Sequence, residues 1–178
     1  MSDLCQSLEA EHRTIERVLD ALEREAKKVT GGAAVDKEFF TKAITFVREF
    51  ADGLHHQKEE SVLFPRMAEA GVPKDGGPIG VMLYEHDEGR HFVRGMSESL
   101  EAAASGDAQA REALVRSAFG YAALLRAHIM KEDQVLFPMA DHVFNERQKG
   151  SIREAFVEAE AVDPRRDDAH RKWAGGLT

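Results

Sequence analysis

The sequence has 178 residues, of which 31% are charged and 43% hydrophobic, as in a soluble globular protein of one domain. The net charge of −8, without a basic cluster, argues against nucleic acid or an anionic membrane as a partner. No apolar run reaches the roughly 18 residues of a membrane span, and the N-terminal residues lack a signal-peptide core. The single cysteine, Cys5, cannot form a disulfide within the chain, so we expect a cytoplasmic protein.

The pattern predicts an all-α protein. Segments rich in Ala, Glu, Leu, Lys and Arg alternate with turns that contain glycine or proline. These turns define four long helices, a shorter fifth helix and a charged tail, at residues 3–29, 36–69, 78–104, 107–144, 145–161 and 163–178. Asp36 and Asp107 are the expected N-caps of the second and fourth helices. Short connections favour an antiparallel up-down-up-down four-helix bundle with a short extra C-terminal helix.

Each long helix carries a histidine within its apolar face. These histidines are His12, His55, His86 and His128 in chain order. Each lies about 20 to 22 residues from a turn, so a rise of about 1.5 Å per residue places all four at one level of the bundle. Glu59 and Glu132 follow one turn after the second and fourth histidines and share their helix faces.

An internal repeat supports this register. The segment from His55 to Pro65, which ends in Val-Leu-Phe-Pro, matches the segment from His128 to Pro138 with an offset of 73 residues. The pairs Glu11-His12 and Glu85-His86 match with an offset of 74 residues. Because proline disturbs the preceding helical turn, we expect both repeated helices to kink or end at the prolines.

Four imidazoles and two carboxylates at one level are suited to a pair of metal ions. The predicted ligands are His12, His55, Glu59, His86, His128 and Glu132. Imidazole combined with carboxylate suits iron, zinc or manganese, and a carboxylate can bridge two ions. Without a cation, the buried carboxylates would carry a desolvation penalty of several kcal/mol.

The repeat also indicates which of the neighbouring polar residues are less suited to be metal ligands. Because Val-Leu-Phe-Pro aligns His55 with His128, His56 lies about 100° further round a helix and is expected to be exposed, or to assist the ligands by hydrogen bonding. The same geometry favours Glu132 over Asp133 as a ligand.

The remaining histidines are expected outside the site. His91 is predicted at the surface, and His142 and His170 are predicted to be solvated. Glu11 and Glu85 are candidate hydrogen-bond partners of the ligating imidazoles. The roles of Arg90, His91, His56 and Asp133 stay open.

The order His12, His55-x-x-x-Glu59, His86, His128-x-x-x-Glu132 resembles that of the hemerythrin-like (HHE cation-binding) domain family, over roughly residues 5 to 145. The resemblance implies a four-helix bundle, which we place at residues 1–162. It also implies a non-haem di-iron centre of two iron ions, with these six residues as ligands. The glutamates and an oxo or hydroxo group would bridge the irons.

Two departures from the family's known members limit the functional inference. Oxygen-carrying hemerythrins have a fifth histidine one turn after the third-helix ligand, where this sequence has Arg90. The di-iron proteins of iron–sulfur repair have paired cysteines, whereas this sequence has only Cys5. Ferritin-like proteins use Glu-x-x-His on their helices, which differs from the His-x-x-x-Glu order here.

Two functions are consistent with this pattern. The first is a di-iron protein of oxidative or nitrosative stress that binds, senses or slowly reacts with O₂, NO or peroxide. The second is a metal-storage or metal-sensing module that acts through a protein partner. With six-coordinate irons, the six ligands and one bridge leave two positions open, which favours oxidation in air over reversible oxygen carriage. The sequence does not indicate an enzyme class, and either a monomer or a homodimer is expected.

Overall fold

The computed structural model describes residues 4–177, and every regular element in that range is helical, which confirms the predicted all-α class. The α-helices are α1 (Gln6–Thr30), α2 (Lys37–Phe46), α3 (Phe64–Glu69), α4 (Pro78–Ala104), α5 (Ala108–Lys131), α6 (Phe137–Val143), α7 (Glu146–Glu160) and α8 (Pro164–Gly175). Three π-helical segments interrupt them: η1 (Val47–His56), η2 (Glu59–Leu63) and η3 (Glu132–Leu136). The expected helix start at residue 3 and the outer limits of the 1–162 domain and the tail lie outside the described residues.

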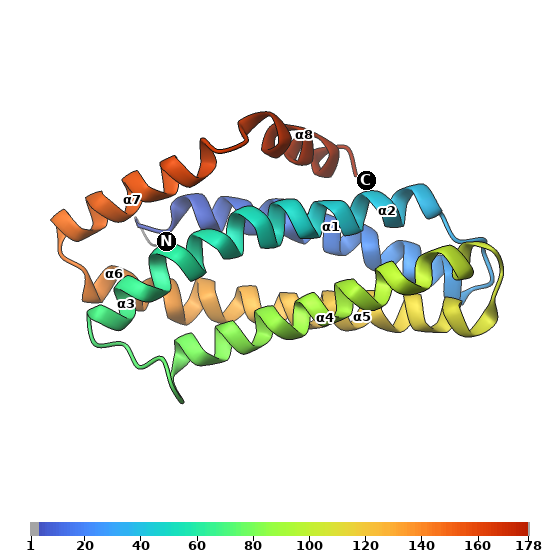
Figure 1. Ribbon diagram of the computed structural model, residues 1–178, viewed down its shortest axis with the longest axis horizontal. Coiled ribbons are helices and arrows are strands. Elements are labelled where there is room, and N and C mark those ends of the chain that lie inside the picture. The colour runs from blue at the N-terminus through green and yellow to red at the C-terminus, as the bar shows by residue number, and fades with distance from the viewer. Residues whose placement is uncertain (1–3, 178) are drawn as a thin grey trace.

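The long helical segments run along the length of the molecule (Figure 1). They are α1, the segment from α2 to α3, α4, and the segment from α5 to α6. Helix α5 packs against both α1 and α4, and α2 packs against α4. Helices α7 and α8 lie along one side, where α7 contacts η2 and α8 contacts α1.

Side-chain caps begin two of these segments where the sequence predicts them. Asp36 accepts a hydrogen bond from the Phe39 N–H at 2.9 Å, and Asp107 accepts one from the Ala110 N–H at 2.7 Å. Each carboxylate satisfies a backbone donor that the first helical turn leaves unpaired, and its negative charge suits the positive end of the helix dipole.

The apolar interior is divided into two clusters, one toward each end of the long helices. On α1, Leu8 belongs to one cluster and Ile15 to the other, with His12 between them. On α4, Met82 and Val93 likewise belong to different clusters and lie on either side of the third histidine. The predicted ligands therefore occupy a polar layer between two apolar cores.

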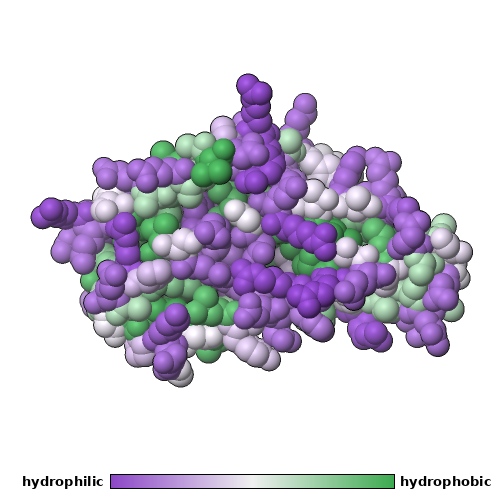
Figure 2. All heavy atoms as spheres, viewed as in Figure 1, coloured by the Kyte–Doolittle hydropathy of each residue, from purple (hydrophilic) through white to green (hydrophobic). Residues whose placement is uncertain are grey.

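Hydrophilic side chains cover most of the face drawn in Figure 2, with apolar side chains showing in separate patches between them. Over residues 4–177, none of the helices combines the length and apolar character that crossing a membrane requires.

The two repeated prolines do not end their helices. Segments η2 and η3 stop two residues before Pro65 and Pro138, and the chain then continues as α3 and α6. Proline has no N–H for the carbonyl four residues earlier, and a π-helical turn accommodates this loss without breaking the helix. A helical wheel of 100° per residue predicts Val135, seven residues after His128, on the same inner face as that histidine. The wider turn changes the rotation of the residues around the helix axis, and Val135 is instead 52% exposed.

Gly53 lies in the middle of η1. A Cβ atom at this position would approach the carbonyl oxygen of Arg48 to 2.9 Å, closer than side chains normally lie to backbone. The absence of a side chain therefore helps the chain to form the π-helical turn.

The expected charged tail contains helix α8. Asp163 caps this helix by accepting from the Arg166 N–H at 3.2 Å. Trp173 packs on Phe46, with ring centroids 5.8 Å apart. His170, predicted to be solvated, instead packs edge-on against Phe46 and is hydrogen-bonded to Glu49 at 2.9 Å. Charge alone did not reveal that one side of this segment packs on the bundle.

Candidate metal centre

The structure brings together all six predicted ligands in the polar layer between the apolar cores. They are His12 from α1, His55 from η1, Glu59 from η2, His86 from α4, His128 from α5 and Glu132 from η3. Every one of these side chains is at most 1% exposed. Elements far apart in the chain therefore meet at one buried point.

The four imidazoles form two pairs. Nε2 of His12 lies 3.0 Å from Nε2 of His55, and Nε2 of His86 lies 3.1 Å from Nε2 of His128. Zinc–imidazole bonds are about 2.0 to 2.1 Å long, so two imidazoles at right angles on one ion have their nitrogens about 3.0 Å apart. Each pair therefore has the spacing of two ligands of a single metal ion.

The two glutamates connect the pairs. Oε2 of Glu132 lies 3.1 Å from Nε2 of His12, and its Oε1 lies 3.1 Å from Nε2 of His128. Oε1 of Glu59 lies 3.8 Å from Nε2 of His55, and its Oε2 lies 3.5 Å from Nε2 of His86. Each carboxylate thus presents one oxygen to each pair, as a carboxylate does when it bridges two ions.

A carboxylate on the outer side of each imidazole orients the ring. The contacts to Nδ1 are His12 with Asp133 (2.7 Å), His55 with Glu11 (3.0 Å), His86 with Glu60 (2.7 Å) and His128 with Glu85 (2.9 Å). Because an ionised carboxylate can only accept, the Nδ1 atoms donate, and this assigns the tautomer in which the Nε2 lone pair faces the centre.

Each outer carboxylate is in turn paired with a cation. These pairs are Glu11 with Lys58 (2.7 Å), Glu85 with Lys131, Glu60 with Arg90 (2.7 Å) and Asp133 with Arg13. The sequence identified Glu11 and Glu85 as candidates but not the other two carboxylates or the cations. Lys58 and Lys131 occupy equivalent positions of the repeat, which is the signal that could have revealed them.

The carboxylates give the site a strong preference for positive charge. Burial by itself would lower the pKa of His12, but the hydrogen bond with Asp133 and the negative charge of Glu132 raise it to about 9. Burial likewise opposes the charged form of His128, yet the charge of Glu132 raises its pKa to about 10. Burial, reinforced by the charge of His12, holds the pKa of His55 well below its usual value.

The donor set fits a metal cation. Both carboxylate oxygens of Glu59 and of Glu132 are buried, and neither glutamate has a hydrogen-bond partner among residues 4–177. Burial, together with the charge of Glu132, raises the pKa of Glu59. Unpaired buried carboxylates are costly, and a divalent cation is a partner that carboxylates and imidazoles can share.

His56 is buried, so the first of the two alternatives expected for it, an exposed side chain, is wrong. Its ring stacks on that of His86 with centroids 3.8 Å apart. Both histidines belong to η1, whose wider turns depart from the 100° per residue that a helical wheel assumes, and both are buried.

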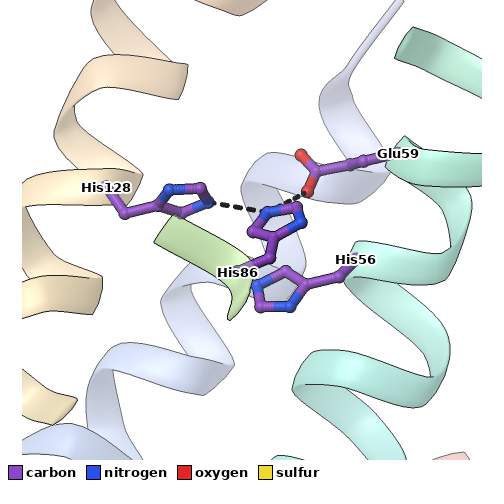
Figure 3. A group of neighbouring side chains, drawn as sticks. All are labelled: His56, Glu59, His86 and His128. Atoms are coloured by element: carbon purple, nitrogen blue, oxygen red, sulfur yellow. Dashed lines mark hydrogen bonds and ion pairs between the residues drawn. The ribbon is translucent and has the colours of Figure 1, made fainter. Parts of the chain in front are cut away.

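Four residues around His56 lie close enough to hold one ion. A ligand atom from each of His56, Glu59, His86 and His128 lies within 4.8 Å of the others. Figure 3 shows His56 and Glu59 projecting from one helical segment toward His86, with His128 approaching from the opposite side. His12, His55 and Glu132 form a second such group.

Three residues whose roles the sequence left open can now be placed. His91 is exposed, as predicted. Asp133 orients His12 from outside the centre. Arg90 donates to Glu60 at 2.7 Å and to Asp87 at 2.9 Å, and also pairs with Asp52, so carboxylates already occupy its guanidinium. The predicted solvation of His142 agrees with its exposed position.

A pocket of about 220 Å³ adjoins the His86 side of the centre. His56, His86, Arg90 and Tyr121 are among the residues that line it. The hydroxyl of Tyr121 is buried and has no hydrogen-bond partner in the described part of the chain. The pocket therefore gives a small polar molecule a place beside the imidazoles.

In a comparison with known families, the hemerythrin HHE cation binding domain matches residues 3–140. The chain belongs to this family. Its cation-binding character agrees with the buried histidine and glutamate groups described above.

Relatives of this HHE protein include uncharacterized proteins of Mycobacterium bovis and of two Mycobacterium tuberculosis strains. Each is 24% identical over 155 residues, which cover 87% of this chain and 60% of the relative. The chain thus spans about 60% of the length of these relatives. No solved structure matches it.

Proposed function

We propose that the chain is a non-haem di-iron protein in which an antiparallel up-down-up-down four-helix bundle holds both ions. One ion would lie at the His12–His55 pair and the other at the His86–His128 pair, with Glu59 and Glu132 as bridges. The observation that supports this most strongly is that each glutamate directs one carboxylate oxygen toward each of the two histidine pairs. Iron is consistent with the mixture of imidazole and carboxylate donors and with the family.

We further propose that the physiological ligand is a small molecule such as O₂, NO or peroxide. The pocket beside His56 and His86 measures about 220 Å³, below the roughly 300 to 1,000 Å³ of sites for larger organic ligands. Bound iron would supply the redox chemistry. The chain's own residues fix the imidazole tautomers and surround the centre with apolar packing.

Metal analysis tests the two-ion part of the proposal. Protein purified from iron-supplied cells should contain about two iron ions per chain, whereas His55→Ala and His128→Ala should each lower that content. His142→Ala, at an exposed position, is the matched control and should retain the wild-type content. A wild-type protein that binds one ion or none would contradict the proposal.

Rapid mixing tests the small-ligand part. Reduced iron-loaded protein should change its optical spectrum within seconds of meeting O₂, NO or peroxide. The alternative is a metal-storage or metal-sensing module that acts through a partner. It draws support from the greater length of the relatives, in which the domain has additional sequence beside it. An iron-loaded protein that is inert toward all three molecules would favour the module.

A further inference from the structure

Outside the six predicted ligands, His56 is the side chain whose surroundings most closely reproduce theirs. Its Nδ1 lies 3.2 Å from Oδ1 of Asp52, just as each predicted ligand has an outer carboxylate at Nδ1. Asp52 is in turn paired with Arg90 at 2.7 Å, which repeats the carboxylate–cation pairing of the other four histidines. His56 therefore has the same chain of contacts as the predicted ligands, from imidazole to carboxylate to cation.

The other ring nitrogen of His56, Nε2, makes no hydrogen bond within the described residues. This nitrogen is also buried. A buried polar atom without a partner is costly, and in native proteins such atoms are usually explained by a function or by a bound ion or water. With Asp52 accepting from Nδ1, Nε2 carries a lone pair, the form in which imidazole binds a metal.

The position of His56 identifies which ion it would bind. It belongs to the group of side chains that also contains Glu59, His86 and His128, and its ring stacks on that of His86 (Figure 3). The other group, around His12, does not include it.

We propose that His56 is a fifth imidazole ligand of the centre and binds the same ion as His86 and His128. This inference rests on the proposed di-iron function. It gives the two ions unequal surroundings, three imidazoles at one and two at the other. A fifth imidazole would also fill one of the two coordination positions that six ligands and one bridging group leave open on the irons. Arg90, which stands where a third-helix histidine would be, holds Asp52 and thereby orients the substitute ligand from η1.

The test compares iron-loaded wild type with His56→Phe, which keeps an aromatic ring to stack on His86 but removes both nitrogens. His91→Phe, at an exposed position, is the matched control. X-ray absorption should show a fall from five imidazoles per two irons to four in His56→Phe only. Loss of an outer partner alone costs about 10- to 100-fold in metal affinity, so chelator competition should show one ion weakened at least about tenfold.

An unchanged imidazole count and unchanged chelator competition in His56→Phe would overturn the inference and leave His56 as packing for His86. If the Phe variant does not fold, His56→Ala with added imidazole replaces it, and restoration of the wild-type spectrum supports ligation while no effect refutes it. If the wild type binds a single ion, the proposed di-iron function is wrong. The role of His56 is then tested by whether that single ion has one imidazole fewer in His56→Phe than in the wild type.

Discussion

Lys58 and Lys131 are equivalent in the repeat, yet the structure predicts very different consequences when each is replaced by methionine. Lys58 is fully buried and pairs with Glu11 at 2.7 Å and with Glu160 at 2.8 Å. The side chain of Lys131 is 35% exposed, and its partner Glu85 also reaches solvent. Methionine keeps an unbranched chain of similar volume but removes the charge and the N–H donors of the ammonium group.

The magnitudes follow from burial. Removing one member of a buried ion pair costs about 3 to 5 kcal/mol, because the other charge is left uncompensated. For a chain of this size that corresponds to a fall in melting temperature of about 6 to 20 °C. Loss of an exposed pair costs about 0 to 1 kcal/mol. Lys58→Met should therefore be much less stable than Lys131→Met.

Urea denaturation of both variants, in the same metal-loading state, measures this difference. Burial raises the pKa of Glu11 while Lys58 opposes the rise, so Lys58→Met should raise that pKa further. The deficit of Lys58→Met should then shrink as the pH falls and Glu11 becomes neutral. Equal losses of stability in the two variants would refute the reasoning, since both lysines hold an outer carboxylate and differ mainly in burial.

Three further predictions concern the centre and its supports. The affinity of the metal-free protein for metal should rise with pH up to about 9 to 10. Protons compete with the metal for His12 and His128, because their pKa values are raised to about 9 and about 10. Competition with a chelator between pH 6 and 9 measures this affinity, and an affinity that does not change with pH would contradict the prediction. Gly53→Ala should lower stability, because the added Cβ would lie too close to the Arg48 carbonyl oxygen. In an ordinary helix, alanine is more favourable than glycine by about 1 kcal/mol. A raised melting temperature of the variant would therefore argue against strain at this position. Tyr121→Phe should raise stability by up to about 1 kcal/mol by removing a buried hydroxyl that has no partner, and should weaken azide binding in the adjoining pocket; unchanged azide titrations would exclude Tyr121 from that pocket's function.

The repeat explains why the sequence predicted so much of the centre. Val-Leu-Phe-Pro relates the register of two helices independently of any helical wheel, so it matches His55 with His128, and both side chains lie in the buried polar layer. The count of residues from each turn depends only on helical rise, and it placed His12 and His86 at the same level. Both arguments tolerate small errors in helix rotation.

Rotation is where the sequence-based prediction failed. A wheel assumes one constant angle per residue, but η1 and η3 contain wider turns. His56 therefore faces inward and Val135 outward, opposite to the wheel. The pairing of Glu60 with His86 was also missed, because it joins side chains from different helices. Such contacts depend on how helices pack, which periodicity within one helix does not encode.

The position of α7 and α8 on one side has a kinetic consequence for a centre of two ions. On that side, Glu160 of α7 seals the Lys58–Glu11 pair behind His55, whereas His56 and His86 line an open pocket. In the proposed two-ion centre, an ion beside His86 would exchange through the pocket, whereas an ion beside His55 would exchange only after local opening of the covering helices. Isotope exchange should therefore be biphasic. The slow ion would be retained while the fast one is replaced, so two different metals could be loaded in succession.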